Sequence, residues 1–206
     1  MLFMNKLITV LIMLLGCAWM SVTAASIAEK DPVAQAKKVA DQLIVRIEQE
    51  RKQLENDTNR VNQLANELVF PYVDVTKMAR FVMGASWRTA SPEQQQTFVE
   101  LFKKILLNSY ARSFLKLQID HIDFAASRAG ASGKDVEIPA TVFEKSGNAV
   151  AVIFRLFPAG DSWKIYDVEI QGVSLLLNYR SVYASDIDQK GLPAVLEQMR
   201  VQANAL

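Results

Sequence analysis

Apolar residues in the first half of the chain recur at steps of three and four, which is the period of an α-helix. Asp31 followed by Pro32 is typical of a helix N-terminus. The stripe that follows predicts a helix to about residue 47, and the polar stretch over residues 48–56 is expected to separate it from the next helix. This stripe comprises Val33, Ala36, Ala40, Leu43 and Ile47.

Two shorter helices are expected next. Asp57 or Thr58 can cap the first of them, and Pro71 should end it because the residue before a proline disfavours helical geometry. Asp74 can cap the second, and Gly84 lies where that helix should end.

A long fourth helix is expected to begin at the clearest capping signal in the chain, Ser91-Pro92-Glu93-Gln94, and to continue to about Leu117. Its apolar stripe is wider than one helix contact needs, which predicts that it faces a sheet and a second apolar surface. The stripe comprises Phe98, Leu101, Phe102, Ile105, Leu106, Tyr110, Phe114 and Leu117.

After Gln118 the apolar period changes to two, the period of a β-strand. Four alternating segments separated by turn residues predict an antiparallel meander. Pro139 cannot donate a ladder hydrogen bond and predicts an edge strand or a bulge. Helices over about residues 173–185 and 192–201 are expected to close the chain. The four predicted strands cover residues 122–126, 138–142, 150–156 and 166–170.

The N-terminal segment has the composition of a secretory signal peptide. Lys6 is the only charge before Glu29, and an apolar run from Leu7 to Met20 leads into small residues. Cleavage is therefore expected to remove residues 1–25 and to leave residues 26–206 as a single domain. Two alternatives stay open: an uncleaved anchor, and acylation of Cys17, because Leu14-Leu-Gly-Cys17 resembles a lipobox.

The composition of the mature chain argues against several kinds of partner and site. Removing Lys6 from the 23 basic residues leaves 22, against 22 acidic residues, so nothing favours nucleic acid as a partner. Without Cys17 the chain has no cysteine, and the single histidine, His121, cannot build a multi-histidine metal site. Asp120 and Asp123 flank His121, which permits acid–base chemistry or an ordinary solvated strand end. No familiar catalytic motif accompanies this histidine.

Several longer motifs are recognisable together. They are Met78-Ala-Arg-Phe-Val-Met-Gly84, Trp87-Arg-Thr-Ala-Ser-Pro-Glu-Gln-Gln95, Trp163-Lys-Ile-Tyr-Asp-Val168, Gly172-Val-Ser-Leu175 and Asn178-Tyr-Arg180. In this order they resemble the MlaC family of periplasmic phospholipid carriers, also called the toluene-tolerance family. The resemblance covers nearly the whole mature chain. One departure is Tyr72-Val-Asp74, where members often carry Phe-Asp.

The resemblance implies an α+β fold in which helices wrap over a curved antiparallel sheet and enclose an apolar cavity. It implies a periplasmic carrier with phospholipid as cargo, without a cofactor and without catalysis, which moves lipid between the outer and inner membranes and maintains outer-membrane lipid asymmetry. The implied partners are an inner-membrane lipid ABC transporter with an MCE-domain component and an outer-membrane lipoprotein complex.

The cavity implied by the resemblance should be lined by the apolar stripes of the sheet and of the helices. The predicted lining comprises Met78, Phe81, Val82, Phe102, Leu106, Tyr110, Val152, Phe154, Val168, Val173 and Leu176. Trp87, Tyr179 and Arg180 are expected to form or brace the entrance, where Arg180 pairs with the lipid phosphate or, alternatively, with a surface carboxylate. A second class of function stays open, namely a secreted enzyme or small-ligand receptor that uses His121 or Arg180 at a pocket mouth.

Overall fold

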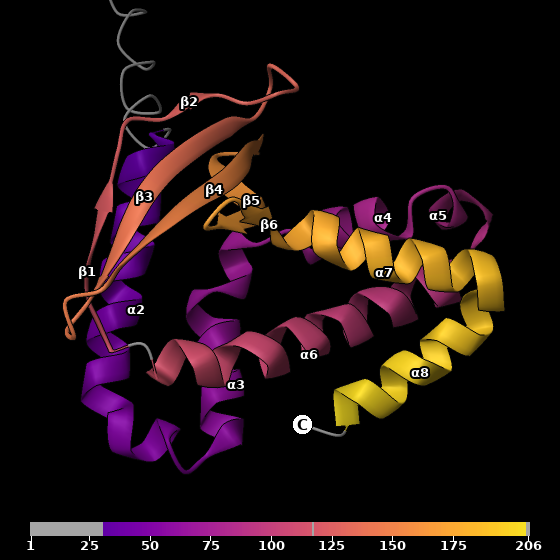
Figure 1. The fold of residues 1–206 in the computed structure, drawn as a ribbon, viewed down its shortest axis with the longest axis horizontal. Coiled ribbons are helices and arrows are strands. Elements are labelled where there is room, and N and C mark those ends of the chain that lie inside the picture. Colours follow the sequence, from indigo (N-terminus) through magenta and orange to yellow (C-terminus); the bar gives the residue numbers. More distant parts are fainter. Residues whose placement is uncertain (1–30, 117, 205–206) are drawn as a thin grey trace, which may run out of the picture. The chain divides into compact units, whose positions relative to one another are not determined.

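The computed structural model describes residues 31–116 and 118–204, and for residues 111–116 it describes the backbone alone. The predicted signal peptide, residues 1–25, and Cys17 lie outside the described residues. The elements labelled in Figure 1 are α2 (Pro32–Leu54), α3 (Thr58–Leu68), the 3₁₀ helix η1 (Phe70–Tyr72), α4 (Val75–Met83), α5 (Ser86–Thr89), α6 (Pro92–Lys116), β1 (Ile119–Phe124), β2 (Arg128–Ala129), β3 (Val136–Glu144), β4 (Ala149–Ala159), β5 (Ser162–Ile170), β6 (Val173–Ser174), α7 (Leu175–Lys190) and α8 (Leu192–Asn204).

Side-chain caps confirm the predicted helix starts. The Asp31 carboxylate accepts a hydrogen bond from the amide of Val33 at 2.8 Å, and the Asp74 carboxylate accepts one from the amide of Lys77 at 2.8 Å. Of the two alternatives for α3, Asp57 is the cap. Each carboxylate satisfies amides that the first helical turn leaves without partners.

The predicted capping box starts α6. The amide of Ser91 donates to the Gln94 side-chain oxygen at 3.0 Å, and the amide of Gln94 donates to the Ser91 hydroxyl at 3.2 Å. The helix that follows contacts α2 and α3 as well as α4 and α8, so it joins two parts of the fold.

The helix α2 is longer than predicted, because the polar stretch after Ile47 continues it to Leu54. Leu54 is buried with Ile47 and Leu64 between α2 and α3. The Glu50 carboxylate on the same stretch pairs with Arg60 of α3 at 2.5 Å. The polar stretch that was predicted to separate the two helices therefore belongs mostly to α2, where its polar side chains lie along the hairpin of α2 and α3.

The predicted antiparallel meander is confirmed, and within the described residues the sheet has six strands rather than four. The additions, β2 and β6, are two-residue strands that pair with β3 and β5. The β4–β5 register shifts between Arg155 and Leu156, which leaves Tyr166 of β5 as an extra residue. Such a bulge bends a strand and increases its twist, in agreement with the curved sheet in Figure 1.

Pro139 lies in β3, an interior strand between β1 and β4, so the prediction of an edge strand or bulge at this residue was wrong. Its carbonyl accepts a hydrogen bond from the amide of Ala125, just after the end of β1, at 2.9 Å. The nitrogen and carbonyl of one strand residue point to the same side. The proline nitrogen therefore faces the gap between β1 and β2, where no ladder bond is lost.

A short strand, not a helix, follows β5. Val173 and Ser174 form β6, and α7 begins at Leu175 and continues to Lys190, beyond the predicted end. Ser174 caps this helix with its hydroxyl. The helix α8 confirms the predicted last helix.

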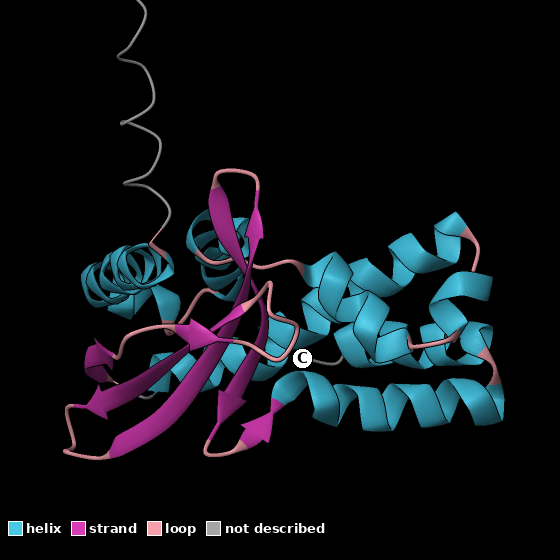
Figure 2. Cartoon of the chain, turned by 90° about the horizontal axis from the view of Figure 1, so that it is seen from above, coloured by secondary structure: helices cyan, strands magenta, loops and turns pink. Residues whose placement is uncertain are grey.

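A helical core forms where α4, α6, α7 and α8 pack together, beside the sheet (Figure 2). Its centre is a group of aromatic rings with centroids 5.1–6.4 Å apart, mostly edge-to-face, a geometry that aromatic pairs favour. These rings belong to Phe98, Phe102, Tyr179 and Tyr183.

Across residues 31–204, as far as they are described, no helix has the length and apolar character that crossing a membrane requires.

Candidate functional site

One face of the sheet is apolar. The register pairs Phe154 of β4 with Ile138 of β3 and with Val168 of β5. Because side chains alternate between the two faces of a strand, these residues lie on the same face as Val152. Val152 is buried, whereas Phe154 and Val168 are only half-buried. The helices over this face therefore leave part of it accessible.

A small apolar cluster, called the sheet-face cluster below, builds up on this face. It consists of Ile119, Val142 and Val152, with Ile44, Ile122, Val150, Phe154 and Val168 packed against them. The helix α2 supplies Ile44 and contacts β1, β3 and β5. The cluster is separate from the helical core, so its half-buried side chains have apolar surface to offer to a ligand.

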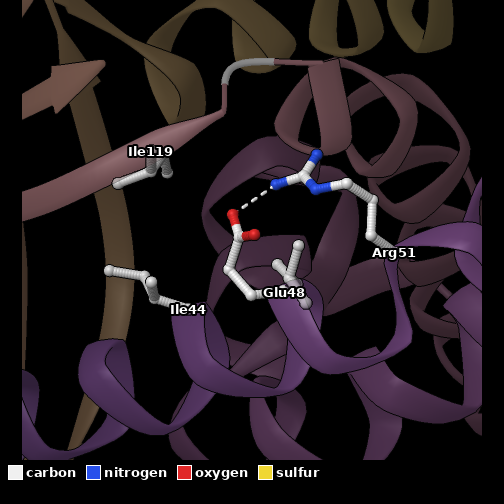
Figure 3. Close-up of a pocket in the computed structure, with 5 residues that line it drawn as sticks. Ile44, Glu48, Arg51 and Ile119 are labelled. Atoms are coloured by element: carbon white, nitrogen blue, oxygen red, sulfur yellow. Dashed lines mark hydrogen bonds and ion pairs between the residues drawn. The ribbon is translucent and has the colours of Figure 1, made fainter. Parts of the chain in front are cut away.

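A narrow pocket lies between α2 and β1, next to the sheet-face cluster. Its lining residues are Ile44, Ile47, Glu48, Arg51 and Ile119. Figure 3 shows Ile44 and Ile119 on its apolar side and Glu48 directed at Arg51 on its polar side. The pocket volume is about 10 Å³, which is room for about one water molecule. In this structure the sheet and α2 are therefore close together.

Charged side chains form the rim of this pocket. The Glu48 carboxylate accepts hydrogen bonds from Arg51 at 2.6 Å and from Lys145, in the β3–β4 turn, at 3.0 Å. The hydrogen bond from Arg51 and the one from Lys145 lower the pKa of Glu48. The turn is tied to the start of β1, since the amide of Lys145 donates to the carbonyl of Gln118 at 2.9 Å.

Most of the predicted lining and entrance residues fall into three groups in the structure. Val152, Phe154 and Val168 lie in the sheet-face cluster. Phe81 and Val173 are exposed, with 38% and 59% of their surfaces accessible. A third group belongs to the helical core or packs against it, and consists of Met78, Val82, Trp87, Phe102, Leu106, Leu176 and Tyr179. Which of these residues contact a lipid stays a prediction.

Tyr110, the remaining predicted lining residue, lies half-buried on α6. Burial and a hydrogen bond with Tyr179 raise the pKa of Tyr110. Its hydroxyl therefore stays neutral and has a partner inside the protein, as a polar group in apolar surroundings requires.

Arg180 holds the end of α4. Its Nη1 donates to the carbonyl of Phe81 at 2.6 Å, and its guanidinium lies 4.7 Å from the centre of the Phe81 ring. A Cβ at Gly84 would come within 3.2 Å of Arg180 Nη2, so the glycine makes room for this contact. The described partners are thus a backbone carbonyl and an aromatic ring rather than a surface carboxylate. Pairing of Arg180 with a lipid phosphate stays a prediction.

We expect Arg180→Ala to lower the free energy of unfolding by about 1–2 kcal/mol, because the variant loses a charge-assisted hydrogen bond and a ring contact. Urea titration measures this change, and Arg200→Ala, which removes an exposed arginine of α8, is the matched control. Phospholipid lost from a variant of unchanged stability would instead indicate that Arg180 contacts the headgroup.

His121 lies on the other face of the sheet. It pairs with Phe143 in the register, one residue out of phase with Ile122 and Val142 of the sheet-face cluster. Its ring stacks on Phe143 at 4.6 Å, and its Nδ1 lies 2.8 Å from the Asp120 carboxylate. Half of the side chain is exposed. His121 therefore does not lie at the mouth of the apolar site.

The sequence did not point to Ile44, Glu48 or Arg51 as site residues. The usable signal was their spacing of four and three residues, which places them on one face of α2. The stripe through Leu43 and Ile47 drew attention to the neighbouring face, which packs on α3.

No group of three or more histidine, cysteine, aspartate or glutamate side chains in the described part of the chain could hold a metal ion.

Comparison with known proteins agrees with this fold. The profile of the family described as MlaC protein matches residues 37–201. The chain is 22% identical over 89% of its length to the "intermembrane phospholipid transport system binding protein MlaC" of Haemophilus influenzae, covering 87% of that protein. It is 23% identical over 81% of its length to the "toluene tolerance protein ttg2D" of Pseudomonas putida, covering 77% of that protein.

A solved structure is also similar. It is the phospholipid-binding protein of Ralstonia solanacearum in complex with a phospholipid, with a TM-score of 0.77 and 26% sequence identity. The match covers 84% of this chain and 97% of that one. With a family profile that spans most of its length, this chain belongs to the MlaC family.

Proposed function

We propose that this chain is a periplasmic phospholipid carrier that holds acyl chains against the apolar face of the sheet. The observation that carries the proposal is the half-buried sheet-face cluster, in a fold that matches a protein solved with phospholipid. Each methylene removed from water contributes about 0.8 kcal/mol, so two acyl chains left bare would cost more than about 20 kcal/mol. A lipid that crosses an aqueous space therefore needs such a shelter.

Lipid loading requires more space than the pocket beside the cluster offers. Ligand sites for molecules of this size occupy on the order of several hundred Å³. The sheet and α2 therefore move apart when acyl chains enter between them.

As a carrier, the protein exchanges lipid with an inner-membrane ABC transporter containing an MCE-domain component and with an outer-membrane lipoprotein complex, and so maintains outer-membrane lipid asymmetry.

The direct test is mass spectrometry of solvent extracts from the purified mature chain. We expect about one phospholipid per chain, because a filled apolar site holds its lipid strongly. An extract without phospholipid, from protein that was purified from cells containing it, would contradict the proposal.

The carrier performs no chemistry on its cargo. We expect His121→Gln to transfer labelled phospholipid to membrane-bound partners at the parent rate, because His121 lies on the face opposite the apolar site. Glu197→Gln on α8 serves as the surface control. Transfer abolished in a folded His121→Gln protein, or lipid cleaved by the parent, would favour the enzyme alternative.

A further inference from the structure

Two cationic side chains and one carboxylate lie at the rim of the pocket between α2 and β1, among the residues that the structure describes. Arg51 and Lys145 both pair with the Glu48 carboxylate, so these three side chains together have a net charge of +1. The nearby Glu144 is occupied within its own turn by Ser146 and Asn148. Of the three rim side chains, 22% of Arg51, 38% of Glu48 and 45% of Lys145 is exposed. These charged side chains are therefore partly open to solvent at the end of the pocket.

Apolar and charged groups follow one another along this pocket. Ile44 and Ile119 belong both to the pocket lining and to the sheet-face cluster. Ile119 is buried, Ile44 is half-buried, and the charged rim is more exposed. The order from inside to outside is thus apolar, then cationic, which is the order of acyl chains and phosphate in a phospholipid.

We propose that Arg51 and Lys145 bind the phosphodiester of a bound lipid, and that Glu48 occupies their hydrogen-bonding positions when no headgroup is present. This inference rests on the proposed function and names the group that fixes the headgroup. Arginine presents a planar pair of donors that suits two phosphate oxygens, and lysine adds a compact charge.

Replacing Glu48 by a phosphate as the partner of Arg51 and Lys145 costs little free energy. Exposed ion pairs contribute little to stability in water, so the carboxylate can turn away. A phosphodiester carries one negative charge, and it neutralises the net charge of these three side chains even while Glu48 stays nearby. The headgroup beyond the phosphate remains in solvent, so the site selects for phosphate and not for a particular headgroup alcohol.

Binding of two fluorescent probes to delipidated protein tests the proposal. One is phosphatidylglycerol labelled with NBD on an acyl chain, and the other is diacylglycerol with the same labelled chains. In Arg51→Gln/Lys145→Gln we expect phosphatidylglycerol to bind about tenfold more weakly and diacylglycerol to bind unchanged. In Glu48→Gln we expect phosphatidylglycerol to bind about two- to fivefold more tightly, because a competitor is removed.

Matched controls exist on α7 and α8. Arg200 pairs with Glu197 at three-residue spacing, as Arg51 does with Glu48, and Lys190 pairs with Asp186. Arg200→Gln/Lys190→Gln should leave both probes unaffected. Opposite effects of changing the carboxylate and of changing the cations would not arise from a merely structural ion-pair trio.

Three results would overturn the inference. The first is equal weakening of both probes in Arg51→Gln/Lys145→Gln, and the second is no change for either probe. The third is calorimetric binding of inorganic phosphate alone as tight as that of the lipid, which would make this a free-anion site. If the parent protein bound neither probe, the proposed function itself would fail, which is a distinguishable outcome.

Discussion

Replacing Asp167 with alanine is expected to lower the free energy of unfolding by about 3–5 kcal/mol. The Asp167 side chain is 6% exposed and accepts three hydrogen bonds. The donors are Arg155 Nη1 at 2.9 Å, the Ser174 hydroxyl at 2.7 Å and the amide of Leu176 at 3.0 Å. The residue thus connects β4, β5, β6 and the start of α7, and its removal leaves buried donors without a partner.

Urea unfolding monitored by circular dichroism measures the loss. Asp167→Asn keeps the size of the side chain and removes its charge, so we expect an intermediate loss and a protein that still folds. Asp123→Ala is the matched control, since this aspartate of β1 is 71% exposed, and it should change stability by less than about 0.5 kcal/mol. Equal stability of the Asp167 and Asp123 variants would contradict this role of Asp167 in connecting β4, β5, β6 and α7.

Features that depend on neighbouring residues could be predicted from the sequence. Asp31, Asp74 and the Ser91–Gln94 pair cap helices through residues two or three positions away, so their signals are contained in a few letters. The alternation along β4 likewise placed Val152 and Phe154 on one face. These predictions needed no knowledge of the rest of the chain.

Side-chain hydrogen bonds between residues distant in the sequence could not be predicted. The Asp167 carboxylate in β5 accepts a hydrogen bond from the amide of Leu176 in the first turn of α7, nine residues later in the chain. The side chain of Gln35 bonds to the backbone of Trp163, 128 residues later, and so attaches α2 to the start of β5. Nothing in the local sequence distinguishes such residues from ordinary surface residues.

The candidate site shows the same limit. Periodicity indicates that a stripe is buried but not what covers it. Met78 and Phe102 carry the apolar pattern expected of a cavity wall, yet they pack against other helices in the helical core. Ile44 has no obvious stripe of its own and contributes to the sheet-face cluster. A filled core and a lipid-binding face therefore look alike in sequence.

Replacing Val152 or Val168 with tryptophan is expected to remove most of the bound phospholipid. Both side chains belong to the sheet-face cluster, and an indole there occupies space that acyl chains need. Overpacking costs about 1–3 kcal/mol, which corresponds to a loss of affinity of about 5- to 150-fold. Because Val168 is half-buried and Val152 is buried, we expect Val168→Trp to be the better tolerated of the two.

The matched control lies one residue away. Ala151 precedes Val152 in β4, points to the opposite face and is exposed, so Ala151→Trp adds the same ring without entering the site. Phospholipid extracted per folded chain is the measurement, with thermal unfolding as the check on folding. Full phospholipid occupancy in folded Val168→Trp and Val152→Trp proteins would show that the acyl chains lie elsewhere, and the helical core around Phe102 would then be the next face to test.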